Sequence, residues 1–185
     1  MRSKIFEVLG LGPSLKYYDP EKCLETIGVN DICAYHKVDH LLLMDPPSHF
    51  NEKRLNNIKN SKPKTTFSNL MEWEFMPGFQ KIKIAGPEHG GDVSSLDDWE
   101  CLPRHVDSTF TAVCLAYHFD ANDIILHGVD FKNHNLAHYS DQIIRAYSKL
   151  HAALIQRGIM LWVGSDESLL SKFIPNWNEL DDLIF

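Results

Sequence analysis

The sequence predicts a single α/β domain built on one doubly wound, mostly parallel sheet. Three observations support this class. Short apolar runs end repeatedly at small or polar residues, helical patterns alternate with these runs, and a glycine-containing turn follows the first run. The length of 185 residues suits one domain, and 44% hydrophobic with 23% charged residues is typical of a soluble globular chain.

Five short apolar runs are the predicted strands. Continuous apolar runs are typical of parallel strands that are buried on both faces. The carboxyl ends of parallel strands meet at one edge of the sheet, where open α/β sheets bind ligands. We therefore expect the polar residues after these runs to gather there. The runs are 5–9, 25–29, 40–44, 124–129 and 159–163.

Two segments, 108–118 and 140–157, have apolar residues at helical spacing. Ser108 is a predicted N-cap of the first, and Gly158 is a predicted stop for the second. Strand, helix and strand follow one another at both ends of the chain, which favours crossover units.

We expect residues 1–185 to form one nucleotide-binding α/β domain with a less regular insertion at about 51–104. Within that insertion, 81–85 is compatible with a strand, and 86–104 is expected to be a long surface loop.

The composition excludes several classes of protein. A formal net charge of −7 without a basic patch argues against binding to duplex nucleic acid. None of the four cysteines forms a CxxC pair, so we expect neither a zinc site nor a disulfide framework. We expect a cytoplasmic location, where cysteines stay reduced. No run approaches membrane-spanning length, and the first residues lack the features of a signal peptide.

The turn after the first predicted strand is the first candidate ligand site. Gly10 and Gly12 permit a tight turn and a close approach of backbone N–H groups to an anion, Pro13 follows, and Ser14 offers a hydroxyl. The turn lacks the third glycine of the dinucleotide fingerprint and the GK[ST] of a P-loop, so an ordinary strand-to-helix turn remains the alternative.

Polar residues after later runs add further candidates. They are Asn30, Asp31, Asp45, Ser108, Thr109, Gly128 and Asp130. An amide can contact a base or ribose, a carboxylate can bind a ribose hydroxyl or a metal, and a helix start can hold a phosphate. Helix capping is the alternative for the serine and the carboxylates. The ten histidines contain one HxxxH pair near a predicted helix, at His134 and His138, and we expect no metal site.

Several of these motifs, in this order, resemble the bacterial sialyltransferases of glycosyltransferase family 42. A more distant resemblance is to a related family that includes an archaeal 6-hydroxymethylpterin diphosphokinase. The segments that carry the resemblance are 10–16, 30–31, 45–50, 107–116, 124–131 and 168–175. They touch both ends and most of the chain outside 51–104.

This resemblance implies a modified Rossmann fold and a cytidine-type nucleotide. The glycine loop, Asn30 and the Ser108–Thr109 turn would contact the nucleotide and its phosphate. His138 would be the catalytic base that deprotonates the acceptor, and Asp130 would position the donor or the histidine. No metal would be required.

The chain departs from the family pattern in three places. Leu11 stands where the family usually has Asn, and Ser108–Thr109 replaces a Ser–Gly pair. Only residues 131–137 lie between Asp130 and His138, and they contain no tyrosine, so the family's tyrosine-bearing lid is missing. A lid excludes water from the reaction and completes the site.

Three functions therefore stay open at this point. The first is a small glycosyltransferase with a CMP-type nucleotide-sugar donor and a glycan or small-molecule acceptor. The second is a magnesium-dependent diphosphokinase or pyrophosphohydrolase, in which Asp31, Asp45 and Asp130 bind the metal. The third is a non-catalytic nucleotide-binding module. The sequence also leaves open whether the chain forms a homo-oligomer.

Overall fold

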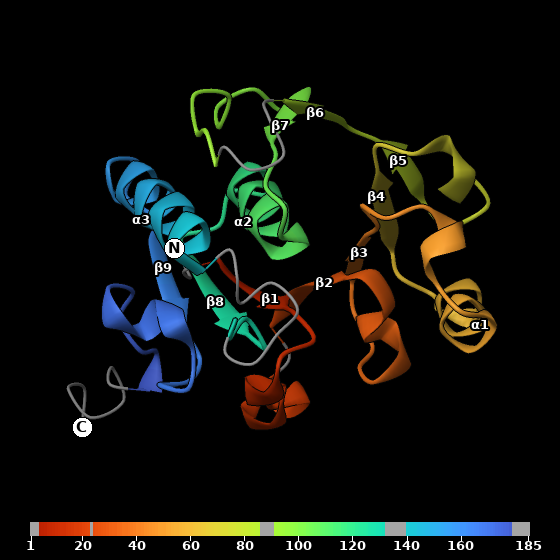
Figure 1. Cartoon of the computed structure of the whole chain (residues 1–185), viewed down its shortest axis with the longest axis horizontal. Helices are drawn as coiled ribbons and strands as arrows, with labels where there is room; N and C mark the ends of the chain where they lie inside the picture. Colours follow the sequence, from red (N-terminus) through yellow and green to blue (C-terminus); the bar gives the residue numbers. More distant parts are fainter. Residues whose placement is uncertain (1–3, 23, 86–90, 132–139, 179–185) are drawn as a thin grey trace.

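A computed structural model describes residues 4–22, 24–85, 91–131 and 140–178 (Figure 1). Its main sheet has seven strands in the order β5-β4-β3-β2-β1-β8-β9, and every neighbouring pair is parallel. The strands are β1 (Ile5–Leu9), β2 (Glu25–Val29), β3 (His40–Leu42), β4 (Thr65–Ser68), β5 (Phe79–Lys81), β8 (Asp123–His127) and β9 (Met160–Val163). The predicted doubly wound parallel sheet is confirmed.

The five predicted apolar runs all contain strands of this sheet. In the central strands β1, β2 and β8, every residue after the first is buried. Such burial on both faces is the reason these strands lack the apolar–polar alternation of a half-exposed sheet. At one edge of the sheet, β9 makes a further parallel bridge from Val163 to Asn176.

Helices cover both faces of the sheet (Figure 1). Helices α2 (Ser108–His118) and α3 (Ser140–Ile155) contribute to the larger apolar core, which includes Phe6, Phe110 and Leu150. Helix α1 (Glu52–Asn60) and the 3-10 helix η3 (Asn30–Ala34) contribute to a smaller core around Trp73. No helix in the described part of the chain is long and apolar enough to cross a lipid bilayer.

The N-cap of α2 differs from the prediction. Asp107 is the capping residue, and Ser108 is the first helical residue. The Asp107 side chain accepts hydrogen bonds from the backbone N–H groups of Thr109 and Phe110. Because a carboxylate has two acceptor oxygens, Asp107 can hold both groups at once. At the end of α3, Gly158 has φ +75°, as expected for a helix stop.

Part of the expected insertion at 51–104 belongs to the main sheet. Strands β4 and β5 lie in this region and extend the sheet beyond β3, and helix α1 precedes them. Strands β6 (Lys83–Ala85) and β7 (Cys101–Pro103) form a separate two-stranded sheet. Strands of three or four residues without a continuous apolar run are too short for the sequence pattern to show.

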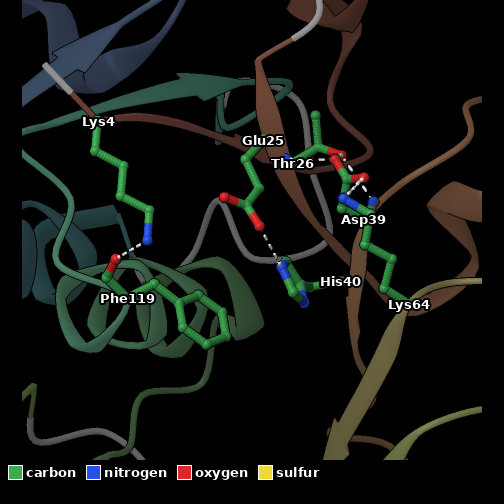
Figure 2. Close-up of polar contacts among 7 residues, drawn as sticks. All are labelled: Lys4, Glu25, Thr26, Asp39, His40, Lys64 and Phe119. Carbon is green, nitrogen blue, oxygen red and sulfur yellow. Dashed lines mark hydrogen bonds and ion pairs between the residues drawn. The ribbon is translucent and has the colours of Figure 1, made fainter. Parts of the chain in front are cut away.

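Polar contacts tie neighbouring elements together at the start of the strands (Figure 2). The Thr26 N–H donates to Asp39 Oδ2 at 3.0 Å, and the Asp39 N–H donates to Thr26 Oγ1 at 2.9 Å. Lys64 Nζ lies 2.9 Å from Asp39 Oδ1. Lys4 Nζ reaches the carbonyl oxygen of Phe119, which links β1 to the end of α2. These contacts fix the lateral position of the strands whose other ends form the site.

Asp39→Asn tests the contribution of this network to stability. Burial alone raises the pKa of Asp39, but the hydrogen bonds from Lys64 and Thr26 lower it more, and the net shift is downward. A lowered pKa stabilises the fold at neutral pH, and that contribution is lost as the pH falls through the folded-state value. We expect the variant to lose about 1 kcal/mol of unfolding free energy at pH 7, and less at pH 3.

Urea denaturation at the two pH values measures this difference. Asp141→Asn, an exposed change on α3, is the matched control. An equal loss at pH 7 and pH 3 would contradict the assigned role of the Asp39 carboxylate.

Candidate functional site

A cavity of about 260 Å³ lies where the carboxyl ends of the central strands meet. From β1 the strand order runs outward through β2 to β5 on one side and through β8 to β9 on the other. The cavity borders this reversal, which is the usual ligand position in an open α/β sheet. Its lining comes from residues 10–13, 29–30, 45, 106–109 and 128–131.

The structure brings together nine of the twelve predicted site residues in this lining. They are Gly10, Gly12, Pro13, Asn30, Asp45, Ser108, Thr109, Gly128 and Asp130. Ser14 and Asp31 are not in the lining. His138, the predicted base, lies outside the described residues.

The glycine loop after β1 is bonded to the loop after β8. The Gly10 N–H donates to the carbonyl oxygen of His127 at 2.8 Å, and the Gly12 N–H donates to that of Gly128 at 2.7 Å. These two N–H groups are therefore not available to a phosphate, in contrast to the sequence-based expectation. In this structure they connect the loop after β1 to the end of β8 and the loop that follows it, and both loops line the base of the pocket.

Close approach of the two loops explains the need for glycine here. A Cβ atom on Gly10 would lie 2.5 Å from the Gly128 carbonyl oxygen, and one on Gly12 would lie 2.5 Å from Asp130 Oδ2. Gly128 itself has φ +66°, a conformation that glycine adopts without strain.

Ser14 lies behind the lining and bonds to two of its residues, Gly128 and Asp130. Its side chain is buried, its N–H donates to Asp130 Oδ2 at 2.7 Å, and its Oγ accepts the Gly128 N–H at 3.1 Å. Ser14 lies outside the pocket lining, so its hydroxyl is not placed to donate to a ligand there as expected, and its oxygen accepts a bond between the two loops. Ser14 thus fixes the orientation of the Asp130 carboxylate.

Two buried oxygens in the lining have no hydrogen-bond partner among the described residues. They are Asn30 Oδ1 and Asp130 Oδ1. Asp130 is only 3% exposed, and Asn30 has φ +52°, which is uncommon outside glycine. Buried polar atoms normally have partners, so an unpaired pair of acceptors in a cavity points to a ligand that supplies donors.

The three carboxylates proposed for magnesium are not assembled. Asp31 makes a two-pronged ion pair with Arg54 of α1, with distances of 2.8 and 2.6 Å, which removes it from the pocket. Asp45 remains in the lining, with its Oδ1 3.7 Å from His49 Nδ1. No group of three His, Cys, Asp or Glu side chains suited to a metal ion is found within the described segments.

The start of α2 contributes Asp107, a lining residue that was not among the predicted site residues. Asp107 lines the pocket, and its Oδ2 accepts a hydrogen bond from the Tyr147 hydroxyl at 2.6 Å. The Thr109 hydroxyl donates to the same oxygen and is therefore occupied within the protein. An aspartate directly before a helical pattern is a capping signal, so Asp107 could have been found; the role of Tyr147 depends on tertiary contacts.

Phe131 is another lining residue that was not among the predicted site residues. It lines the pocket with φ +58°, an unusual value for a bulky side chain, and its ring packs 5.9 Å from that of Tyr147. Strained backbone of this kind is concentrated at functional sites.

Solved structures of a known enzyme share this architecture. The sialyltransferase CstII from Campylobacter jejuni, in complex with the substrate analogue cytidine-5′-monophosphate, aligns with a TM-score of 0.60 and 15% identity, over 94% of this chain and 84% of that chain. The fold is that of CstII. A complex of CstII with CMP-3FNeuAc aligns with a TM-score of 0.59 and 16% identity, over 94% and 85% of the two chains.

Comparisons of whole sequences do not find this similarity. No protein-family model matches the sequence, and no curated protein sequence is significantly similar to it. The sialyltransferase-like fold expected from the sequence motifs is confirmed.

Gly12→Ala tests the contact between the two loops. The added methyl group would meet Asp130 Oδ2 and the Gly128 carbonyl oxygen, so the loops must separate. We expect a loss of about 1–3 kcal/mol in unfolding free energy, as for overpacking elsewhere. Urea denaturation measures it, with Leu11→Ala, at a partly exposed neighbouring position, as the control. Wild-type stability of Gly12→Ala would refute the close packing.

Proposed function

We propose that this chain is a small glycosyltransferase that uses a CMP-type nucleotide-sugar donor. The observation that carries the proposal is the cavity at the sheet reversal, with buried, unpaired acceptors on Asn30 and Asp130. The fold adds support, because CstII structures with this architecture contain cytidine-5′-monophosphate or CMP-3FNeuAc.

Asn30 would recognise the nucleoside. Its free Oδ1 can accept a hydrogen bond from the exocyclic amine of cytosine or from a ribose hydroxyl. The left-handed backbone at Asn30 turns the chain at the end of β2, so this amide lies in the pocket lining.

His138 would be the general base. It would remove the proton of the acceptor hydroxyl while that oxygen attacks the anomeric carbon of the sugar. The bond between this carbon and the phosphate oxygen breaks, and CMP leaves with the bonding electrons. A histidine suits this step because its pKa is close to neutral. Asp130 would position the donor, and the acceptor is a glycan or a small molecule.

The alternatives have less support. The magnesium-dependent diphosphokinase requires three carboxylates, but Asp31 is paired with Arg54 outside the pocket lining. A non-catalytic module is distinguished by experiment, since it would bind nucleotide without turnover. The segment between Asp130 and His138 has no tyrosine, so hydrolysis of the donor is expected to compete with transfer.

Binding of CMP is the direct test of the pocket. Saturating CMP should raise the melting temperature, and at about 100 times the dissociation constant the stabilisation is about 2.7 kcal/mol. Asn30→Gly removes the amide and keeps a residue suited to φ +52°. We expect about tenfold weaker CMP binding in this variant, the loss of roughly one hydrogen bond.

Asn56→Ala, an exposed change on α1, is the control for this measurement. UDP, GDP and adenine nucleotides, with and without magnesium, complete the panel. The absence of a thermal shift with every nucleotide would refute the proposed function.

His138→Ala tests the assigned base. Turnover of CMP-sialic acid should fall at least 100-fold, the usual contribution of general-base catalysis, while CMP affinity stays within about twofold because the base contacts the acceptor. His151→Ala, on α3, is the control. Normal turnover in His138→Ala would remove the assignment.

A further inference from the structure

The α2 end of the pocket already contains an anion of the protein itself. The Thr109 N–H donates to Asp107 Oδ1 and the Phe110 N–H to Oδ2, both at 3.2 Å. These N–H groups at a helix start are the ones that would otherwise bind a phosphate. Asp107 thus occupies the position of an anionic ligand at this terminus.

The two oxygens of Asp107 are used unequally. Oδ2 accepts three hydrogen bonds, from the Thr109 hydroxyl, the Tyr147 hydroxyl and the Phe110 N–H. Oδ1 accepts only one bond within the described structure, from the Thr109 N–H. Because each oxygen of a carboxylate has two lone pairs, Oδ1 keeps one acceptor position, whereas Oδ2 is fully used. Asp107 lines the pocket and is 8% exposed, so a bound molecule can reach it.

Tyr147 fixes the Asp107 carboxylate in this orientation. Tyr147 is fully buried on α3, and its ring makes an edge contact with Phe110 at 5.6 Å. Burial first, and the Asp107 charge second, raise the pKa of Tyr147 well above its usual value. The hydroxyl is therefore protonated at neutral pH and donates a hydrogen bond to Oδ2.

The negative charge of the pocket lining also disfavours a bound anion. Asp45, Asp107 and Asp130 line it, and no Lys, Arg or His does so among the residues that the structure describes. Asp130 Oδ1, which is buried and has no partner among the described residues, is a further acceptor in the same cavity. A phosphate or carboxylate at the α2 end would be repelled by Asp107 at short range. A hydroxyl group would instead find an acceptor.

We propose that Asp107 makes the α2 end of the pocket a binding site for a ligand hydroxyl group and excludes phosphate and carboxylate groups from it. This inference rests on the proposed function for the identity of the ligand: the hydroxyl belongs to the ribose or to the transferred sugar. It differs from the expectation that Ser108 and Thr109 hold the phosphate. Tyr147 is a positioning residue that acts through Asp107.

Asp107→Gly is the decisive variant. Glycine is tolerated at an N-cap, and its introduction frees the N–H groups of Thr109 and Phe110 for an anion. Calorimetry should show inorganic phosphate binding at least tenfold more tightly to Asp107→Gly than to the wild type. Asn51→Gly is the matched control, because it removes the N-cap side chain of α1, a helix that contributes no residue to the pocket lining. Asp107→Asn keeps a cap and replaces the glycine variant if that variant does not fold.

A second arm identifies the hydroxyl. If it belongs to ribose, cytidine should bind at least tenfold more weakly to Asp107→Asn than to the wild type. If it belongs to the sugar, CMP-sialic acid should lose this factor while cytidine does not. Tyr147→Phe should show part of the same loss, and its melting temperature reports any general loss of structure.

The outcomes separate the two proposals. Equal phosphate affinity of wild type and both Asp107 variants overturns the exclusion of anions. Unchanged affinity for cytidine and CMP-sialic acid in Asp107→Asn overturns the hydroxyl site. If the wild type binds none of the cytidine ligands but the phosphate difference is present, the proposed function fails and the exclusion of anions stands.

Discussion

The contact between the loop after β1 and the loop after β8 is the constraint on which the site depends. The Gly10 N–H donates to the last residue of β8, the Gly12 N–H donates to the first residue after it, and the Ser14 N–H donates to Asp130. This set of bonds holds together the two halves of a sheet that winds in opposite directions from its centre. It positions Asp130 and brings the strand ends close enough to enclose a cavity. The cavity is therefore lined by acceptor oxygens whose positions are set by the fold.

The two sides of the cavity are formed by the elements that flank these loops. On one side, η3 begins at Asn30, where a left-handed residue turns the chain at the end of β2. On the other side, Asp107 caps the start of α2. Tyr147 on α3 donates a hydrogen bond to Asp107 and so connects the two helices. Both walls present oxygen acceptors to the cavity. The fold is shared with CstII, whereas the acidic character of the pocket comes from this chain's own side chains.

The sequence predicted the central sheet because β1, β2, β8 and β9 contain continuous apolar residues, and it predicted the position of the site because polar residues follow those strands. It did not reveal β4 and β5, which are short and lack an apolar run. The use of the Gly10 N–H could not be predicted either, because its partner lies on a strand far along the chain. Asp31 was misplaced because its ion pair with Arg54 depends on how α1 packs.

The pairing of β1 with β8 also has a consequence for folding. The Ser14–Asp130 bond joins residues 116 positions apart, and the strands β2 to β5 are all synthesised between them. Before such a long-range parallel pair can form, a large loop must close and lose conformational entropy. This entropy loss precedes the stabilising contacts, and it slows folding. During synthesis β1 must wait with one edge unpaired until β8 has left the ribosome. We therefore expect the pocket to form late in folding, and a chain that stops before β8 lacks the residues that close it.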